Sequence, residues 1–405
     1  MGRGRWLLLT LLVVAVFVNY ADRSNLAIAA PLLSKELALS PLQLGSLLSA
    51  FSITYALLQL TGFAGWLADR FPVGLVFAAG FLIWSGATAI TGLVSGITML
   101  FAMRLLLGAG ESLAYPCISK ILASDFPQEQ RGLANSLLDA GMKLGPALGT
   151  LLGGLLMSRF GWRVFFLATG LGGLLWLIPW YFKMPRTPGV KRGEPTPGPT
   201  VWHILEQPSA WGSFGALFCA NYFWFFLLTW LPTYLVRDRG YSMDRMATAG
   251  SLAYFAIAAA TVVTGWLSDR WIARGMSPTR ARKGAVITGL ALSTIILPVA
   301  VVRDSDVSLG LLMAACLSFG IFCSNHWAIT QTLAGPLAAG RWTSIQNGAG
   351  NIGGIVAPWF TGWVVERTNS FVPAFVAAAV IVLAGAALYA FAIGKVEQVD
   401  WSPNT

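Results

Sequence analysis

Charged side chains are scarce in this chain. Of its 405 residues, 11% are Asp, Glu, Lys or Arg and 56% are hydrophobic, whereas a soluble globular domain carries about 25% charged residues. The chain therefore has too little polar surface to surround a water-soluble core. This composition argues against a soluble fold and indicates that lipid is the main solvent.

Residue patterns for metal binding and catalysis are also missing. The four cysteines lie in apolar runs without CxxC or Cys/His spacing, as is typical of buried small hydrophobic residues. No HExxH, GxSxG or glycine-rich phosphate loop is present. We expect no metal, no cofactor and no enzymatic activity. The formal charge of +10 is spread over short loops, so we expect no nucleic-acid partner.

Long apolar runs are abundant, and a helix needs about 20 such residues to cross a bilayer. They predict an all-α membrane protein with twelve transmembrane helices, at residues 6–33, 42–67, 73–95, 97–123, 132–158, 164–182, 209–235, 246–267, 284–302, 307–333, 342–365 and 371–393. The expected parts are a six-helix bundle at 1–183, a Pro- and Gly-rich cytoplasmic linker at 184–208, a second six-helix bundle at 209–394 and a cytoplasmic tail at 395–405.

The two bundles are expected to be a parallel repeat. GWLADR at 65–70 recurs as GWLSDR at 265–270, and Asn19-Tyr20 recurs as Asn221-Tyr222. Glycine ladders also recur in the fifth and eleventh helices, at Gly141, Gly145, Gly149 and Gly153 and at Gly350, Gly354 and Gly362. Small residues at this spacing let helices approach closely in lipid, and we expect both ladders to face the opposite half.

Four segments carry a family resemblance: NYADRSNLAIAAPLL at 19–33, GWLADR at 65–70, RLLLGAGESLAYP at 104–116 and WAITQTLAGPLAAGRWTSIQNGAGNIGGIVAP at 327–358. Together they resemble the major facilitator superfamily, and within it the anion:cation symporters that include sugar-acid importers and sialin-like carriers. The resemblance implies uptake of a small carboxylate in symport with protons, or in some members sodium. We expect a monomer in a bacterial-type inner membrane, with alternating access between the two halves.

Charges inside membrane helices are costly and are functional by default. The first half holds six of them: Asp22, Arg23, Arg104, Glu111, Asp139 and Lys143. Neighbouring helix residues do not face each other, so Asp22 and Arg23 each need another partner. The resemblance implies that Asp22 is a protonatable carboxylate and that Arg23 binds the substrate carboxylate. The alternative is a purely structural role.

Glu111 follows Arg104 by seven residues, which places both side chains on one helix face. A carboxylate in a low-dielectric cavity takes up a proton more readily than one in water. The resemblance implies that Glu111 couples transport to protons and that Arg104 is its buried ionic partner. A structural ion pair is the competing interpretation.

Asp139 and Lys143 are four residues apart and can form an ion pair within their helix. Lys143 lies beside the glycine ladder, so it is also a candidate to meet a substrate anion. The family often has small or amide residues here, which leaves the identity of the substrate open.

Neutral polar residues complete the candidate substrate site. Tyr55 and Gln59 match the family pattern FSxxYxLLQ, in which the tyrosine hydroxyl faces the substrate. Asn347 and Asn351, one turn apart, can present amides to the substrate, although hydrogen bonds between helices would also explain them.

Short loops hold a candidate gate, because GWLxDR resembles the gating motif of the superfamily. We expect Asp69, Arg70, Asp269 and Arg270 to act in conformational change, with Arg131 as a partner of the aspartates. Proton-driven drug efflux is an alternative function, but Arg23 and Lys143 argue against it. A transporter-like receptor would need a signalling domain, which the chain does not suggest.

The distribution of Lys and Arg predicts that the N-terminus, the linker and the C-terminus lie in the cytoplasm, because most basic residues then fall inside. A cysteine placed in the linker should resist an impermeant thiol reagent added to intact cells and react after the cells are opened. Labelling from outside would show that the linker lies on the outer side and that the orientation is the opposite one.

Overall fold

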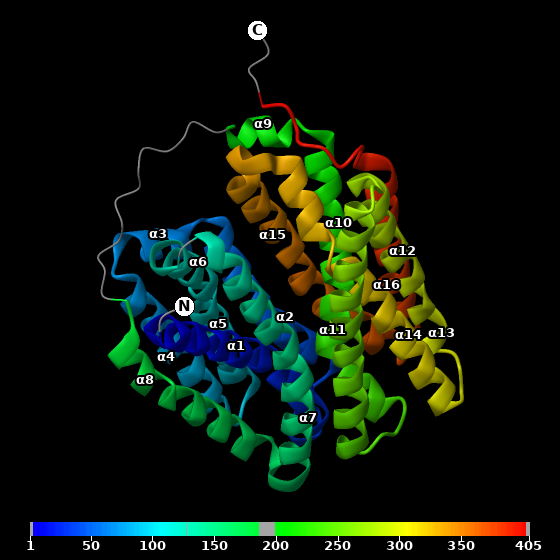
Figure 1. Ribbon diagram of the computed structural model, residues 1–405. Helices are drawn as coiled ribbons and strands as arrows, with labels where there is room; N and C mark the ends of the chain where they lie inside the picture. Colours follow the sequence, from blue (N-terminus) through cyan, green and yellow to red (C-terminus); the bar gives the residue numbers. More distant parts are fainter. Residues whose placement is uncertain (1–2, 127, 186–198, 402–405) are drawn as a thin grey trace. The chain divides into compact units, whose positions relative to one another are not determined.

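A computed structural model describes residues 3–126, 128–185 and 199–401, and the side chains at all of these except 3, 69, 123, 128–133, 136 and 336. The described residues are mostly helical and contain no strand. The helices up to Lys183 are α1 (Arg3–Glu36), α2 (Pro41–Leu60), α3 (Phe63–Arg70), α4 (Val73–Thr91), α5 (Ile97–Ser112), α6 (Ala114–Asp125), α7 (Gln128–Leu175) and α8 (Leu177–Lys183) (Figure 1).

The helices from Val201 onward include two short π-helices, η1 and η3, and one 3₁₀ turn, η2. They are α9 (Val201–Leu205), α10 (Pro208–Arg237), α11 (Met243–Ala273), η1 (Thr279–Lys283), α12 (Gly284–Leu292), η2 (Ser293–Ile295), α13 (Ile296–Val299), α14 (Ser305–Cys323), α15 (His326–Thr368), α16 (Val372–Ala387) and η3 (Leu388–Ala392).

All twelve expected spans fall on these helices. Ten stretches of the described chain are long and apolar enough to cross a membrane. One of them, Leu137–Lys183, contains the sixth expected span and most of the fifth, which are separated where Gly161 adopts a φ of 78°. Residues 342–365 are helical within α15 but are not among the ten.

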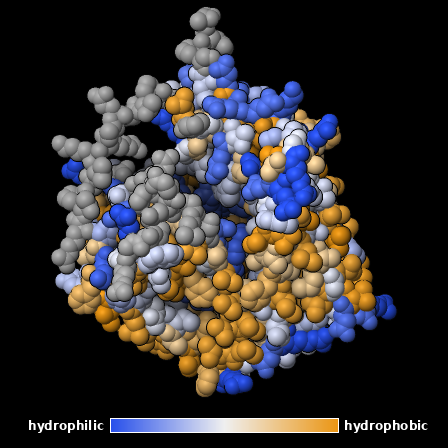
Figure 2. Space-filling model, in the orientation of Figure 1, coloured by the Kyte–Doolittle hydropathy of each residue, from blue (hydrophilic) through white to orange (hydrophobic). Residues whose placement is uncertain are grey.

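Hydrophobic residues cover much of the middle and lower part of the face seen in Figure 2, and hydrophilic residues gather mainly near its upper and lower rims. Large apolar residues such as Leu93, Val262 and Phe391 are exposed in the absence of lipid, at 69%, 73% and 88%. A soluble protein rarely exposes contiguous apolar surface of this kind. The helices therefore present the surface of a multi-pass membrane protein.

The chain folds into two compact units. The first contains Met1–Lys191, Leu228–Ser251 and Pro358–Glu366, and the second contains Arg192–Leu227, Leu252–Ala357 and Arg367–Thr405. The bundle of α1 to α8 thus lies in the first unit. The segments of α10, α11 and α15 named above pack with it, and the remainder of these helices belongs to the second unit.

The glycine ladder of α7 packs against α1, within its own half. A Cβ atom added at Gly145 would lie 2.8 Å from the carbonyl oxygen of Phe17, and one at Gly149 would lie 3.2 Å from Ala21. The expectation that this ladder faces the opposite half is therefore wrong. The glycines let α1 and α7 approach backbone to backbone, which fixes the rotation of α1 about its axis.

The second ladder repeats this arrangement in the second unit. A Cβ atom at Gly350 would lie 2.7 Å from the amide of Asn221, and one at Gly353 would lie 2.8 Å from the backbone nitrogen of Tyr222, both on α10. Gly353 is not itself a member of the ladder. Gly362, which is, packs against Pro41 of α2 in the first unit and so meets the opposite half, as expected. The α7–α1 and α15–α10 contacts are equivalent, as the sequence repeat predicts.

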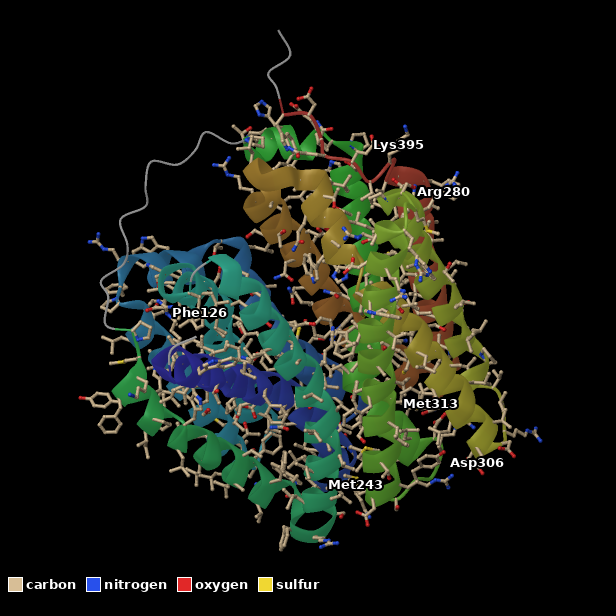
Figure 3. All side chains as sticks on the ribbon, viewed as in Figure 1. Phe126, Met243, Arg280, Asp306, Met313 and Lys395 are labelled. Carbon is tan, nitrogen blue, oxygen red and sulfur yellow. The ribbon has the colours of Figure 1, made fainter. Side chains whose placement is uncertain are left out.

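In the second unit, the start of α12 and the C-terminal segment lie at one end, and the α13–α14 connection lies at the other. Figure 3 shows Arg280 and Lys395 at the first end and Asp306 at the second. The backbone N–H of Val396 donates to Thr279 Oγ1 at 2.9 Å, and that of Val399 donates to the Leu333 carbonyl at 2.9 Å. The C-terminal segment is therefore held against its own unit.

The close approach of α1 and α7 gives a testable prediction. Gly145→Ala should lower the free energy of unfolding by about 1–3 kcal/mol, because the new methyl group meets backbone that has little room to move. Gly172→Ala, in the same helix, meets no atom within 4 Å and should be neutral or slightly stabilising. Thermal unfolding of the purified variants in detergent compares them, and equal stability would contradict the proposed contact.

Candidate functional site

A buried ion pair joins α1 to α5. The Nε atom of Arg23 donates to Oε2 of Glu111 at 2.8 Å. The Arg23 side chain is 8% exposed and that of Glu111 is fully buried. Because two charges away from water are stable only as partners, the contact ties the middle of α1 to the end of α5.

Glycine and threonine bring α5 close to α2 beside this pair. A Cβ atom at Gly108 would lie 2.2 Å from the carbonyl oxygen of Phe51, and Oγ1 of Thr54 donates to the Leu105 carbonyl at 2.7 Å. Gly108 lies between Arg104 and Glu111 on one face of α5. Both charged side chains are therefore held against α2.

A proline ends α5 directly after Glu111. Pro116, in the first turn of α6, has no N–H to donate to the carbonyl four residues earlier, that of Ser112. Nε2 of Gln59 donates to this carbonyl instead, at 2.9 Å. The sequence pattern proposes Gln59 as a substrate ligand, and its side-chain donor also stabilises the helix break beside Glu111.

Aromatic rings surround the guanidinium of Arg23. Its central carbon lies 4.4 Å from the ring centre of Tyr20, 5.1 Å from that of Phe51 and 4.8 Å from that of Tyr55. A cation over the face of an aromatic ring is attracted by the quadrupole of the ring. Tyr20 and Tyr55 are thus placed beside Arg23, and Tyr115 extends the group by donating to the Tyr20 hydroxyl at 3.4 Å.

Asp22 and Arg104 complete a buried group of charges. Asp22 is 5% exposed, accepts a hydrogen bond from Nδ2 of Asn25 at 2.8 Å, and interacts electrostatically with Glu111 and Arg104. Arg104 is 6% exposed and lies over the ring of Phe51 at 5.3 Å. We call Asp22, Arg23, Arg104 and Glu111 the charged cluster, which carries two charges of each sign.

The charged cluster has unused hydrogen-bonding capacity. Among the described residues, no partner is found for Nη2 of Arg23, Nε of Arg104 or Oε1 of Glu111. Buried polar atoms without partners are costly and call for an explanation. These donors can receive an anion, and the free carboxylate oxygen can receive a proton.

The pairing within the cluster differs from the one expected. Glu111 forms its hydrogen-bonded ion pair with Arg23, from another helix, and Arg104 stacks on Phe51. Arg104 is buried and interacts electrostatically with Glu111, as expected, but the hydrogen-bonded partner of Glu111 is Arg23. Shared position on one helix face indicates proximity but cannot exclude a better-placed donor from a distant segment.

The expectation for Asp139, on α7, is also corrected. Asp139 was expected in a buried ion pair, but its side chain is exposed, while Lys143 is half-buried. Both lie on α7 in the first unit. The face of α7 that carries Asp139 points away from the packed interior, since the glycine ladder occupies the face that contacts α1.

The two asparagines proposed as substrate ligands belong to the second unit. Nδ2 of Asn351 donates to the backbone carbonyl of Asn347 at 2.8 Å and lies 3.3 Å from its Oδ1 atom. Asn351 is buried and Asn347 is half-buried. His326 nearby in sequence contacts the Cys323 carbonyl through Nδ1 at 3.0 Å and stacks on Phe322.

The candidate gate is described in part. The side chains of Asp69 and Arg131 lie outside the described residues, and Arg70 is exposed. Asp269 is 74% exposed and lies 3.4 Å from Nη2 of Arg282, and Arg270 lies over Trp266 at 5.3 Å. Exposed pairs of this kind contribute little stability.

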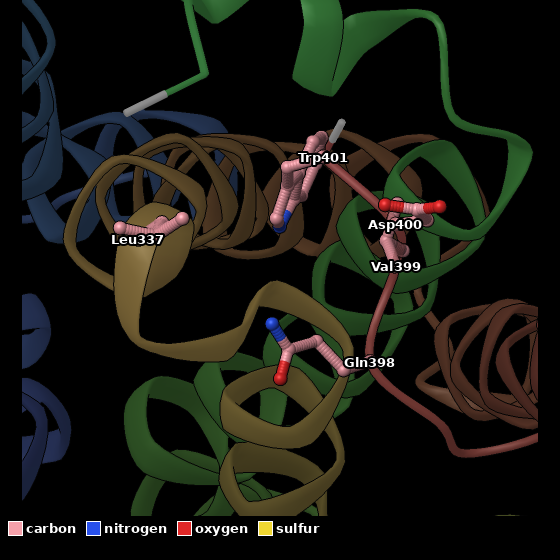
Figure 4. Close-up of a pocket in the computed structure, with 5 residues that line it drawn as sticks. All are labelled: Leu337, Gln398, Val399, Asp400 and Trp401. Atoms are coloured by element: carbon pink, nitrogen blue, oxygen red, sulfur yellow. The ribbon is translucent and has the colours of Figure 1, made fainter. Parts of the chain in front are cut away.

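Several residues at the cluster escape the sequence argument. The segment that holds Asp22 also holds Asn19, Tyr20 and Asn25, and Phe51 precedes Tyr55 by one helix turn. Their closeness in sequence to Asp22 and Tyr55 could have identified them as neighbours of the charged cluster. A pocket of the second unit lies elsewhere, where Leu337 and Gln398–Trp401 meet (Figure 4). None of the predicted substrate ligands lines it.

The long apolar helices define a multi-pass membrane protein. The family model described as Major Facilitator Superfamily matches residues 12–336. The chain belongs to this superfamily.

Named relatives and a solved structure agree with this assignment. The chain is 28% identical to the D-galactonate transporter of Escherichia coli, over 98% of this chain and 97% of the relative. It is 29% identical to the probable galactarate/D-glucarate transporter GarP of Escherichia coli, over 98% of this chain and 96% of the relative. The crystal structure of a bacterial homologue of the human lysosomal transporter Spinster aligns with a TM-score of 0.82 at 19% identity, over 97% of this chain and 98% of that one. This last likeness concerns the fold alone.

Gln59 offers a test of its structural role. Gln59→Met removes the donor to the Ser112 carbonyl and keeps a similar side-chain volume, so it should lower the free energy of unfolding by about 1 kcal/mol. It should leave the KM for a transported acid unchanged. Thermal unfolding and initial uptake rates measure the two effects, and a raised KM at unchanged stability would instead support Gln59 as a substrate ligand.

Proposed function

We propose that this protein imports a small organic acid, such as a sugar acid, together with protons. Transport proceeds by alternating access between two six-helix halves, residues 1–183 and 209–394, which the linker at 184–208 joins. The observation that carries the proposal is the buried ion pair of Arg23 and Glu111. Sugar-acid transporters among the relatives support the class of substrate.

Competition for Arg23 gives a physical basis for coupling. When Glu111 takes up a proton it loses its charge, and the buried guanidinium of Arg23 then lacks its hydrogen-bonded anionic partner. An unpaired buried charge is strongly destabilising. A substrate carboxylate supplies the missing negative charge, so proton binding and anion binding favour each other.

Arg23 is suited to this role because a guanidinium binds a carboxylate through two parallel hydrogen bonds. Its Nη2 atom has no partner among the described residues, and the rings of Tyr20 and Tyr55 hold its plane. We propose that Tyr55 contacts the substrate beside Arg23, and that Lys143, Asn347 and Asn351 contact its hydroxyl or second acidic groups.

Asp22 is proposed as a second proton carrier. It is buried, and Asn25 donates one hydrogen bond to it. The two carboxylates of the charged cluster interact with each other, so protonation of one lowers the cost of keeping the other ionised. Drug efflux is disfavoured because two buried arginines would repel a cationic drug.

Exchange and accumulation separate coupling from binding. Glu111→Gln imitates the protonated carboxyl group, so proteoliposomes containing this variant should bind and exchange labelled D-galactonate or D-glucarate. They should not accumulate either acid when a pH gradient, inside alkaline, is imposed, whereas the wild-type protein should. Glu206→Gln makes the same change at an exposed residue and should accumulate normally.

Each result has a distinct meaning. Accumulation by Glu111→Gln would move coupling to Asp22, and loss of binding and exchange together would make the Arg23–Glu111 pair purely structural. Accumulation by the wild-type protein driven by a sodium gradient instead of a pH gradient would replace the proton as the coupling ion.

A further inference from the structure

One aromatic ring serves both arginines of the charged cluster. The guanidinium carbon of Arg23 lies 5.1 Å from the ring centre of Phe51, and that of Arg104 lies 5.3 Å from the same centre. Arg23 comes from α1 and Arg104 from α5, while Phe51 belongs to α2. Three helices therefore meet at this ring, which is 3% exposed.

The position of the ring is fixed from two sides. The backbone of Phe51 lies against Gly108, where a Cβ atom would be only 2.2 Å from the Phe51 carbonyl oxygen. Its ring stacks on that of Tyr55, with centres 5.5 Å apart and planes 27° apart. Phe51 consequently cannot move away from the guanidiniums without displacing α5 or Tyr55.

Each arginine has reason to depend on this ring. Two guanidiniums in one buried group repel each other, and each retains a nitrogen without a hydrogen-bond partner among the described side chains. The negative face of an aromatic ring attracts a cation without accepting a proton or binding an anion. It can therefore hold an arginine in place and leave its N–H groups available.

We propose that Phe51 is a positioning residue that orients Arg23 and Arg104 through its ring face, so that the free N–H groups of Arg23 are prepared for the substrate acid. Only one part of this role rests on the proposed function, namely the preparation of Arg23 for the substrate acid. The attraction between the ring and the two guanidiniums can be measured without any substrate.

Fluorinated phenylalanine tests the inference with almost no change of shape. Ring analogues with one, two and three fluorines, incorporated at position 51 of the full-length protein, weaken the negative ring face step by step. The melting temperature should fall with each fluorine in the wild-type background. It should fall less in an Arg104→Met background, which retains a side chain of similar length without the charge.

Phe81 provides the matched control. It is fully buried in the same unit and stacks on Trp176, with ring centres 4.2 Å apart, and no cation lies over it among the described residues. The same analogues at position 81 should give melting temperatures that do not depend on Arg104. A decline at position 51 that is equally independent of Arg104 would overturn the inference.

Uptake then tests the functional step. The KM for D-galactonate or D-glucarate should rise with each fluorine at position 51, by about three- to tenfold for the trifluorinated ring, with little change in maximal rate. An unchanged KM would reject the positioning role even if melting shows the attraction. If neither the wild-type protein nor any variant carries an organic acid, the proposed function fails, while the melting series still decides whether Phe51 holds the arginines.

Discussion

Four ions buried in a bundle of apolar helices, Asp22, Arg23, Arg104 and Glu111, impose the main constraint on the first unit. Each is less than a tenth exposed, and an unpaired ion in a medium of low dielectric constant is strongly destabilising. The cluster holds equal numbers of positive and negative groups, so it is neutral as a whole. Neutrality allows these charges to remain inside a membrane protein, provided that α1, α2 and α5 stay in register.

The surrounding sequence maintains that register with small local devices. Gly108 lets α5 approach α2, the glycine ladder of α7 sets the rotation of α1, and Gln59 compensates for the N–H that Pro116 lacks. None of these residues carries charge. They act by fixing the positions of the helix backbones closely. Such placement matters because charge-assisted hydrogen bonds weaken quickly as their distance and angle change.

Incomplete hydrogen bonding in the cluster is consistent with a site that must have more than one arrangement. A fully satisfied network would hold a single state, whereas unused donors on Arg23 and Arg104 and a free oxygen on Glu111 leave room for exchange of partners. A ligand shifts such an equilibrium only by its difference in affinity for the two states. A proton and a carboxylate acting on the same ion pair provide this difference.

The second unit offers a chemical contrast. Its buried polar side chains include Asn325, Gln346 and Asn351, which are neutral. Thr330 donates to Gln346 at 2.7 Å, and Asn325 donates to Ser268 at 3.1 Å. These contacts satisfy polar groups without separating charge, so the two repeated bundles share a fold but differ in the chemistry of their interiors.

The sequence alone determined the lipid environment, the helical spans, the repeat and the small set of ionisable residues inside helices, because apolar length and the cost of buried charge are local properties. It also placed Arg104 and Glu111 on one face. The tertiary structure decided that Glu111 pairs with Arg23, 88 residues away, that Asp139 is exposed, that the α7 glycines face α1 and that Gln59 binds the Ser112 carbonyl. Helix periodicity gives the face on which a residue lies but not the partner that meets it, since the partner depends on how helices distant in sequence rotate and pack against one another.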